Sequence, residues 1–470
     1  MPVSLSGKKV LVMGLGRFGG GVGVSKWLVQ QGALVTVNDA APASELADSI
    51  RALDGLPITF KLGGHDVADF LAADLLVINP AVDRAKSDVV QAAIQKGIPT
   101  TTEMNLFLER CPGVTVGITG SVGKSTTTAL IFEALKAGLS GSQISDLQSQ
   151  IPSVHLGGNI GRSLLMELPS MTPQDIVVLE LSSFMLEETP AIQWSPHIAV
   201  VTNVFENHLD RHGTMAAYTR AKQNILRFQK PTDVAILNMD HELVSRWVHL
   251  ARGKVVKFTT RGPASHRIEM AMPGLHNQSN AAAAMAVVET LAAENIPLDL
   301  AAARDAIARY PGLPHRLQWV YTWELPGPAG PSRVRFYNDS KATSPDASIT
   351  AVHAFAARSA IFIIGGYDKH ISMDSFQEVL ARQAAGVIGI GQTGEAMVKA
   401  VESLRGAARE PRSAYAGTLE AAVELAGQWA VEQRDIMSIV LSPASASWDQ
   451  FPNYEKRGEE FAALAHRIHS

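Results

Sequence analysis

Short apolar segments alternate with longer segments of helical periodicity along most of the 470-residue chain. Apolar runs bounded by glycine, proline or polar residues are typical of buried strands, and apolar residues three and four apart are typical of helices. In the first part of the chain, strands are expected at 9–13, 34–38 and 74–78, and helices at 23–31 and 87–96. Because strands that alternate with helices form parallel sheets, this pattern predicts a doubly wound, Rossmann-like domain at residues 1–112.

The same alternation continues through two further regions. Residues 113–311 contain expected strands at 114–118, 175–181 and 197–202, with a helix at 127–137. Residues 312–470 form a third series, with expected strands at 334–337, 360–364, 386–390 and 438–441. The segment 138–156, rich in Ser, Gln and Gly, is expected to be a loop or an extended connection. The chain is therefore predicted to be an α/β protein of three domains: a Rossmann-like domain, a central P-loop ATPase-type parallel-sheet domain and a second Rossmann-like domain.

A glycine-rich loop separates the expected strand at 114–118 from the expected helix at 127–137. Its residues are Gly120, Ser121, Val122, Gly123, Lys124, Ser125 and Thr126. In this context, bare backbone N–H groups and the positive end of the helix dipole hold phosphates. Lys124 would reach the β- and γ-phosphates, and the Ser125 hydroxyl would bind Mg²⁺. A tight glycine turn with a solvated lysine is the alternative, but the flanking strand and helix favour phosphate binding.

Polar residues end or follow the next two strands of the same region. Glu180 ends the strand expected at 175–181, and His208 lies in a polar segment after the strand expected at 197–202. Since parallel strands end at one edge of a sheet, both side chains are expected near the bound phosphates. A buried carboxylate is costly unless it is paired or bound to a metal, which favours a metal at Glu180. For His208, a metal ligand and a hydrogen-bonded core histidine remain equal alternatives.

Three other polar residues have a default structural interpretation when only residue type and position are considered. Lys222 lies on a helix after Tyr218, where a lysine is normally exposed. Asn277 and Asn280 lie where a helix begins, and asparagine at such a place is typical of helix capping.

A second glycine-rich turn, Gly14 to Gly19, follows the first expected strand, and Asp39 ends the second. This pattern matches the dinucleotide-binding fingerprint, in which the turn holds a diphosphate and the acidic residue binds a ribose. Further glycines at positions 20, 21 and 23 make the turn looser than in the NAD-binding version. NAD and another nucleotide diphosphate are therefore both possible ligands of this turn.

Composition narrows the class of protein. Hydrophobic residues make up 46% and charged residues 18% of the chain, as in globular proteins, and the formal net charge is −4 without a block of like charges. Neither a nucleic-acid-binding surface nor membrane insertion is expected, because no basic run and no apolar run of about 20 residues is present. The single cysteine, Cys111, fits a reducing compartment, and a cytoplasmic location is expected.

The segments that carry chemistry resemble those of one family, the Mur ligases. The resemblance lies in the loop 120–126 and in the segments 179–184, 206–212, 274–280 and 313–316. The segments 338–343, 365–369 and 441–451 are similar to those of the family members that add D-glutamate. An Asp-Asn-Pro-Arg motif, typical of the diaminopimelate-adding relatives, does not occur in the sequence. One departure is Val122, which stands where the family usually has asparagine.

The resemblance implies an ATP-dependent amide ligase of peptidoglycan precursor synthesis. It implies two substrates besides ATP, UDP-N-acetylmuramoyl-L-alanine and D-glutamate, and a monomeric enzyme. ATP would phosphorylate the L-alanine carboxylate, and the D-glutamate amine would attack the acyl phosphate through a tetrahedral intermediate. Two Mg²⁺ ions, or Mn²⁺, and a carbamylated lysine are implied as cofactors. A related ligase that adds another amino acid and a non-catalytic nucleotide-binding sensor remain alternatives.

The resemblance also implies a role for individual residues, and it replaces the capping interpretation of the two asparagines and the NAD interpretation of the first turn. Catalysis is assigned to Lys124, His208, Lys222 and Lys369. The metal ligands are Ser125, Glu180, His208 and Lys222 as its carbamate. ATP is bound by the loop 120–126 with Asn277, Asn280, Arg316 and Asp339. The UDP substrate is bound by Gly16, Arg17, Phe18, Asp39, Asn79, Ala81, Asn159 and Ser183. The D-glutamate pocket is formed by Lys341, Thr343, Lys369, Ser447, Trp448 and Tyr454.

Overall fold

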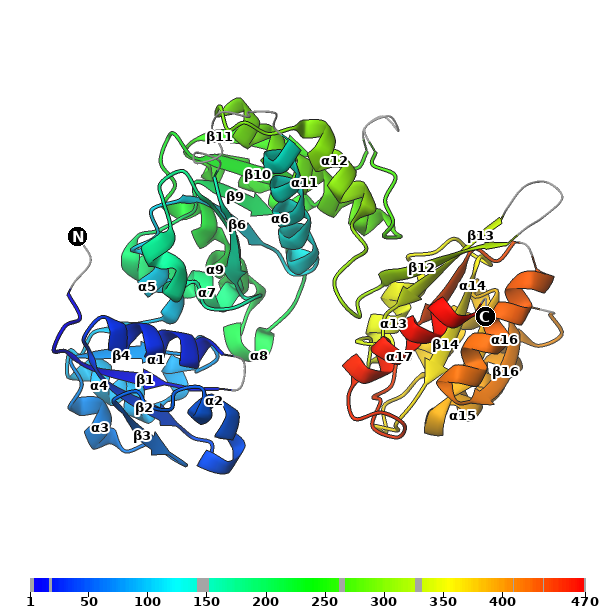
Figure 1. Cartoon of the computed structure of the whole chain (residues 1–470), viewed down its shortest axis with the longest axis horizontal. Coiled ribbons are helices and arrows are strands. Elements are labelled where there is room, and N and C mark those ends of the chain that lie inside the picture. The colour runs from blue at the N-terminus through cyan, green and yellow to red at the C-terminus, as the bar shows by residue number, and fades with distance from the viewer. Residues whose placement is uncertain are drawn as a thin grey trace. The chain divides into compact units, whose positions relative to one another are not determined.

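The chain is a mixed α/β protein with three sheets, each accompanied by helices (Figure 1). A computed structural model describes residues 4–16, 19–141, 152–261, 267–325, 332–408, 410–433 and 435–468. The first two sheets belong to one compact unit, Met1–Arg267 with Ser279–Ala306, and the third sheet belongs to a second unit, Ile268–Gln278 with Ile307–Ser470. The predicted fold class, with N-terminal, central and C-terminal parallel-sheet domains, is confirmed.

The N-terminal sheet has the strand order of a doubly wound fold, β3-β2-β1-β4-β5, and all its strands are parallel. Its strands are β1 (Lys9–Met13), β2 (Leu34–Asp39), β3 (Ile58–Leu62), β4 (Leu75–Ile78) and β5 (Thr100–Thr101). Its helices of more than three residues are α1 (Gly20–Gln30), α2 (Ala47–Arg51), α3 (Val67–Leu71), α4 (Asp88–Gln95) and α5 (Glu103–Leu108). Strand β3 was not predicted because it is an edge strand whose residues are nowhere fully buried, so it has no continuous apolar run.

The central sheet is also parallel, in the order β11-β10-β9-β6-β8-β7. Its strands are β6 (Val114–Thr119), β7 (Val154–Gly158), β8 (Ile176–Glu180), β9 (Ile198–Val201), β10 (Val234–Asn238) and β11 (Lys254–Phe258). Its α-helices are α6 (Lys124–Gly141), α7 (Ser183–Glu188), α8 (Leu209–His212), α9 (Met215–Arg227), α10 (Glu242–Ser245), α11 (Leu275–Ala293) and α12 (Leu300–Arg309).

The loop expected at 138–156 is wrong at both ends. Helix α6 continues to Gly141, and β7 begins at Val154, while residues 142–151 lie outside the described part of the chain. The helix is longer than expected because Gly138 packs against the segment around Leu298 and Asp299. This contact is distant in sequence, so no local pattern predicts it.

The C-terminal sheet has the order β12-β13-β17-β14-β15-β16, in which only the β12–β13 pair is antiparallel. Its strands are β12 (Gln318–Leu325), β13 (Ser332–Asn338), β14 (Ala360–Gly365), β15 (Gly386–Ile390), β16 (Arg412–Gly417) and β17 (Ser438–Leu441). Its helices are α13 (Pro345–Val352), α14 (Asp374–Gln383), α15 (Gly391–Arg405), α16 (Leu419–Glu432) and α17 (Tyr454–Arg467).

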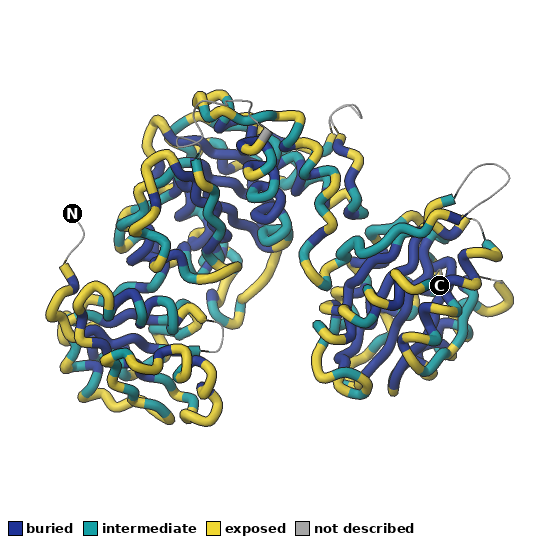
Figure 2. The backbone as a smooth tube through the Cα atoms, viewed as in Figure 1, coloured by how far each residue is buried: buried dark blue, intermediate teal, exposed yellow. Residues whose placement is uncertain are grey.

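The strands form the core of each domain, and the buried segments in Figure 2 follow them. In the central sheet, β8 and β9 are buried along their whole length, as expected for parallel strands covered on both faces. None of the described helices has the length and apolar character needed to cross a lipid bilayer.

Candidate active site

The glycine-rich loop lies between β6 and α6, as predicted, and its glycines are sterically required. Gly123 has a φ of +83°, and a Cβ there would lie 2.6 Å from the Asn280 side-chain oxygen. A Cβ at Gly120 would lie 2.0 Å from the Thr202 hydroxyl. Any side chain at either position would force these neighbours apart, so the loop passes close to β9 and α11 only because both residues are glycine.

Two lysines converge on one carbonyl of this loop. Lys124 Nζ donates to the Gly120 oxygen at 2.8 Å and to the Ser121 oxygen at 3.1 Å. Lys222 Nζ, from α9, donates to the same Gly120 oxygen at 2.8 Å. The default interpretation of Lys222 as an exposed lysine is therefore wrong, since its side chain is only 1% exposed. The packing of α9 directs the side chains of Lys222 and Tyr218 toward the loop, and Lys222 Nζ lies 4.8 Å from the Tyr218 ring centroid.

Burial changes the chemistry of Lys222. Burial, reinforced by the charge of Lys124, lowers the pKa of Lys222 to about 7, although Glu180 opposes this shift. The ordinary pKa of a lysine is about 10.4, so a substantial neutral amine fraction at neutral pH is unusual. A neutral amine is nucleophilic, whereas an ammonium ion is not.

Glu180 lies at the end of β8, next to β6 in the sheet, and is 1% exposed. Its Oε1 accepts a hydrogen bond from Asn159 Nδ2 at 2.9 Å, but its buried Oε2 has no hydrogen-bond partner among the described residues. An unsatisfied buried carboxylate oxygen is costly, and a cation would satisfy it. Glu180 therefore fits the role of a metal ligand. No group of three or more His, Cys, Asp or Glu side chains suited to a metal occurs in the described residues, so Ser125, a carbamate and phosphate oxygens would have to complete the coordination.

His208 is the residue from which α8 begins, and its φ of 54° is in the left-handed region. Partial desolvation lowers the pKa of His208, and the nearby charges of Lys124 and Lys222 act in the same direction, whereas Asp210 opposes them. His208, Lys124 and Lys222 therefore lie close enough together in the first unit for their charges to interact. A histidine held neutral keeps a free ring nitrogen lone pair, which a metal requires.

Asn203, which follows β9, holds the phosphate loop and was not identified from the sequence. Its Oδ1 accepts from the backbone N–H groups of Ser121 (3.1 Å) and Val122 (2.9 Å), and its Nδ2 donates to the Val122 oxygen at 2.8 Å. The amide of Asn203 thus supplies polar contacts beside Val122, where the loop itself has an apolar and 58% exposed side chain. Asn280 also lies at this loop, since its Oδ1 accepts from Thr127 Oγ1 at 3.1 Å, whereas Asn277 donates to the Pro273 oxygen at 2.7 Å.

A cavity of about 390 Å³ lies within the first unit, between the ends of β1 and β4 and the loop after β7. It is at the topological switch point of the N-terminal sheet, because the chain leaves β1 for β2 on one side and β4 on the other. Of the residues predicted to bind the UDP substrate, Asn79, Ala81 and Asn159 line it.

The other residues predicted for the UDP substrate have different positions. Asp39 caps the first turn, with its Oδ2 accepting from the Gly16 N–H at 3.1 Å, and neither residue lines the cavity. Arg17 and Phe18 lie outside the described residues. Ser183 is 2% exposed and lies 3.0 Å from His212 Nε2, whereas its neighbour Ser182 lines the cavity. Adjacent serines at a helix start point in different directions, so the sequence could not distinguish them.

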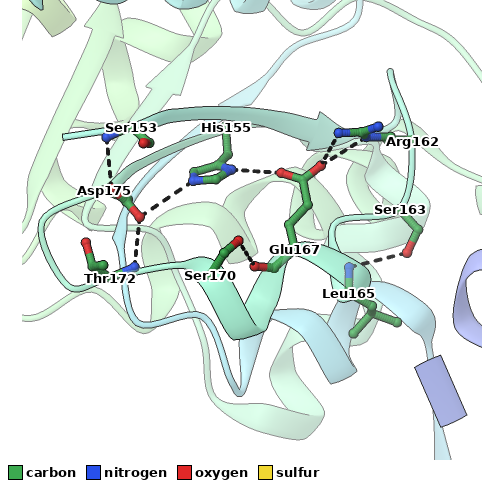
Figure 3. A network of polar contacts seen from close by, with 9 residues as sticks. All are labelled: Ser153, His155, Arg162, Ser163, Leu165, Glu167, Ser170, Thr172 and Asp175. Carbon is green, nitrogen blue, oxygen red and sulfur yellow. Dashed lines mark hydrogen bonds and ion pairs between the residues drawn. The ribbon is translucent and has the colours of Figure 1, made fainter. Parts of the chain in front are cut away.

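A polar network fixes one wall of the cavity (Figure 3). Glu167 lies between His155 and Arg162: its Oε2 is 2.8 Å from His155 Nδ1, and its Oε1 accepts from Arg162 Nε at 3.0 Å. The second ring nitrogen of His155, Nε2, is 3.6 Å from Asp175 Oδ2. Since Arg162 lines the cavity, Glu167 positions a cationic side chain at its edge.

In the second unit, the ends of β13, β17 and β14 are adjacent and gather the residues predicted for D-glutamate. Lys341 Nζ lies 5.3 Å from the Tyr454 ring centroid, and Lys369 Nζ lies 5.7 Å from that of Trp448. Lys369 also donates to the Thr343 oxygen at 3.2 Å. Two lysines beside aromatic rings at one sheet edge supply the cations that the predicted D-glutamate pocket requires for a dicarboxylate. Ser447 lies beside them but is 2% exposed.

Asp339, predicted to lie near ATP, is buried at the same edge. Its Oδ1 accepts from the Leu317 N–H at 3.1 Å and its Oδ2 from Ser442 Oγ at 2.8 Å. Burial raises the pKa of Asp339 to about 7, although these hydrogen bonds and the charge of Arg316 oppose the shift. Through the Leu317 N–H, Asp339 fixes the loop that carries Arg316. The residues on either side of Arg316, His315 and Leu317, both have positive φ.

Arg457, on α17, was not assigned a role from the sequence, and it connects the loops of this pocket. Its guanidinium is 1% exposed and makes four hydrogen bonds of 3.0–3.1 Å, to Ser340 Oγ and to the backbone oxygens of Ser340, Ser445 and Ala446. Burial lowers the pKa of Arg457 only to about 10, so it stays cationic at neutral pH. The loop after β13 and the loop after β17 are thus held to one buried cation.

We expect Arg457→Ala to lower the local stability of these loops by roughly 2–4 kcal/mol, because three carbonyl groups and a hydroxyl lose a charged donor in a buried site. Hydrogen exchange followed by mass spectrometry on peptides spanning 338–343 and 442–457 measures this effect. The adjacent Lys456→Ala, which removes only an exposed pair with Glu459, is the control and should leave exchange unchanged. Equal exchange in the two variants would contradict the assignment.

Comparison with known proteins identifies the family that this fold and site define. Residues 118–267 match the model of the Mur ligase middle domain, and residues 8–102 match that of the Mur ligase MurD-like N-terminal domain. The chain belongs to the Mur ligase family, whose members are ATP-dependent ligases, and the predicted resemblance is confirmed.

The particular relatives are proteins named UDP-N-acetylmuramoylalanine–D-glutamate ligase. The one from Roseiflexus sp. is 35% identical over 98% of this chain and 99% of the relative. The one from Geobacillus kaustophilus is 35% identical over 98% of each chain. Among solved structures, a UDP-N-acetylmuramoyl-L-alanyl-D-glutamate–2,6-diaminopimelate ligase has a TM-score of 0.54 at 16% identity, covering 96% of this chain and 90% of its own. The MurF ligase of Thermotoga maritima, in complex with ADP, has a TM-score of 0.50 at 17% identity, covering 99% and 100%. These structures share the fold.

Proposed function

We propose that this chain is an ATP-dependent ligase that adds D-glutamate to UDP-N-acetylmuramoyl-L-alanine, with release of ADP and phosphate, in peptidoglycan precursor synthesis. The proposal rests on the full-length similarity to relatives of that name. Within the molecule, one observation carries it: Lys124 and Lys222 share the Gly120 carbonyl, and Glu180, whose Oε2 has no hydrogen-bond partner among the described residues, lies near enough to act on the charge of Lys222.

The residues at the phosphate loop would hold the nucleotide and its metals. Lys124 and the N–H groups at the start of α6 would bind the transferred phosphoryl group and its developing charge. Ser125, Glu180, His208 and carbamylated Lys222 would hold two Mg²⁺ ions, for which Mn²⁺ can substitute. When bound, these ions would neutralise negative charge on the phosphate oxygens. The carbamate forms when the neutral Lys222 amine attacks CO₂, making an N–C bond and releasing one proton.

The proposed reaction has two steps. In the first, an oxygen of the L-alanine carboxylate attacks the γ-phosphorus of ATP, the bond to ADP breaks, and an acyl phosphate forms. In the second, the amine of D-glutamate attacks the acyl carbon, and the tetrahedral intermediate expels phosphate as the amine loses a proton. Asn159 would orient the acceptor, because it lines the cavity and donates to Glu180. Lys341 and Lys369 would hold the D-glutamate carboxylates.

Phosphate release from ATP, measured with UDP-N-acetylmuramoyl-L-alanine and a panel of D- and L-amino acids, tests the function. Release that requires D-glutamate, with a product heavier by one glutamyl residue, is the expected result. Release with another amino acid would mean a related ligase with a different specificity. No release with any of them would overturn the ligase assignment and leave a nucleotide-binding sensor.

Lys369→Ala is expected to raise KM for D-glutamate by roughly 30- to 150-fold, because the loss of one charge-assisted contact costs about 2–3 kcal/mol. The KM for ATP should stay within about threefold, since Lys369 lies at the C-terminal sheet edge beside Thr343 and Trp448. Steady-state rates with each substrate varied separately measure both constants. Lys399→Ala, on the exposed face of α15, is the matched control. An effect confined to ATP would remove Lys369 from the amino-acid pocket.

A further inference from the structure

Arg211, on the short helix α8, binds the N-terminal domain through three successive backbone oxygens. Its Nη2 donates to the Val82 oxygen at 2.9 Å and to the Pro80 oxygen at 3.4 Å, and its Nη1 donates to the Ala81 oxygen at 3.2 Å. This loop follows β4, and Pro80 and Ala81 line the 390 Å³ cavity. A planar guanidinium that makes several such bonds has few alternative positions, so it must move with the loop.

The Arg211 guanidinium also lies over an aromatic ring. Its Cζ is 5.1 Å from the centroid of Phe184, which also lines the cavity. The Phe184 ring stacks on His212 with an interplanar angle of 10° and a centroid distance of 5.3 Å, and it lies 5.1 Å from the His208 ring. One side chain of the cavity wall therefore contacts both Arg211 and the predicted metal ligand His208.

Helix α8 holds these groups in a fixed relation. His212 is buried, with Nε2 3.0 Å from Ser183 Oγ and Nδ1 2.9 Å from Glu187 Oε1, so both ring nitrogens face α7. The backbone N–H groups of Arg211 and His212 donate to the His208 oxygen at 3.2 and 2.9 Å. Because His208 to His212 form one closed turn packed on α7, a displacement of Arg211 changes the position of His208.

We infer that Arg211 is a positioning residue that couples an acceptor nucleotide in the cavity to the metal-nucleotide site at His208. An acceptor that contacts Asn79 to Ala81 fixes the loop carbonyls, and Arg211 and Phe184 then fix His208. The coupling places the metal ligand in position when the carboxylate that is to be phosphorylated is bound. This inference rests on the proposed function, because the acceptor it names is the proposed substrate.

The chain provides a matched control in a second contact of the same loop. Arg84 Nη2 lies 2.8 Å from Glu188 Oε2, so this ion pair also joins the N-terminal domain to the end of α7. The charges of Arg84 and Arg211 both act on Glu188, but none of the described contacts of Arg84 involves Phe184 or His208. Removal of Arg84 therefore weakens the domain contact and keeps the hydrogen bonds of Arg211 to the loop and its contact with Phe184. A general loosening of the two domains would affect both arginine variants, whereas loss of the specific path affects only Arg211.

Isothermal titration of the full-length protein with Mg²⁺ and the non-hydrolysable ATP analogue AMP-PNP tests the inference. Titrations are made with and without saturating UDP-N-acetylmuramoyl-L-alanine, and D-glutamate is omitted so that no turnover occurs. In the unchanged protein, the acceptor should tighten AMP-PNP binding by about tenfold, a typical coupling between two sites. In Arg211→Lys, which keeps the charge but loses the planar fork, the effect should fall below about twofold, while Arg84→Ala should keep it.

Each outcome decides between the proposals. Full coupling in Arg211→Lys and Arg211→Ala would overturn the inference. An equal loss of coupling in Arg84→Ala would also overturn it, because the coupling would then depend on the contact between the two domains in general and not on Arg211. Acceptor binding without any coupling in the unchanged protein would overturn the inference and leave the proposed function intact. Failure of the unchanged protein to bind UDP-N-acetylmuramoyl-L-alanine would overturn the proposed function itself.

Discussion

Lys124→Ala is expected to reduce ATP-dependent ligation by roughly 1,000-fold or more, because it removes the cation proposed to bind the transferred phosphoryl group. Lys124 donates to the oxygens of Gly120 and Ser121, and the Gly120 oxygen keeps its hydrogen bond from Lys222 when the Lys124 side chain is shortened. The substitution should therefore leave the fold intact and affect kcat more than the KM for D-glutamate. Initial rates of phosphate release measure the effect.

The control for this prediction lies on the same helix. Lys136 is three turns further along α6, next to Phe132, and Lys136→Ala should keep nearly full activity. Activity of Lys124→Ala within about tenfold of the unchanged protein would exclude a phosphate-binding role, since a general loss of positive charge on α6 would affect both variants alike.

The placement of the glycine-rich loop and of Glu180 could be predicted from the sequence because each of these parts has a local signal. The glycines and Lys124 lie between an apolar strand and a helix, and Glu180 ends another apolar strand. The rule that parallel strands end at one edge then brings Glu180 to the loop, and the order β9-β6-β8 confirms that these strands are neighbours.

The burial of Lys222 has a local signal in the sequence of α9. Tyr218, Ala221, Lys222 and Ile225 recur at helical spacing and are all buried, so Lys222 lies on the apolar face of α9. A lysine on such a face either extends its amine to the surface or is functional. Residue type alone favours an amine that extends to the surface. Only the position of the glycine-rich loop next to α9, where Lys222 donates to the Gly120 oxygen, favours a functional lysine.

Other residues had no local signal at all. These residues, Asn203, Arg211 and Arg457, form side-chain hydrogen bonds with the backbone of loops distant in sequence. Any polar side chain of sufficient length would fit the hydrophobic pattern of the sequence equally well. The same limit applies to the 390 Å³ cavity, where Ser182 and not Ser183 is the lining residue. Such choices depend on the tertiary approach of loops, which hydrophobic periodicity does not encode.

Lys222 is also the residue whose replacement should reveal the most about the metal site. Its amine must lose a proton before it can attack CO₂, and burial lowers its pKa to about 7. Above pH 7 the neutral form predominates and the carbamate can form, whereas below pH 7 the ammonium ion predominates and prevents it. Activity at limiting bicarbonate should therefore fall as the pH is lowered from 8 to 6, and added bicarbonate should restore part of it near pH 7.

Lys222→Ala should lower activity by roughly 1,000-fold, because the proposed carbamate would supply oxygen ligands that no group of three or more His, Cys, Asp or Glu among the described residues can replace. Formate or acetate should restore part of this activity, since a small carboxylate fits the space left by the side chain and supplies equivalent oxygens. Lys222→Arg is the control: it fills the same space with a permanent cation, so it should be inactive and should not respond to formate. Full activity of Lys222→Ala without a carboxylate would exclude the carbamate, and rescue of both variants would show that formate acts elsewhere.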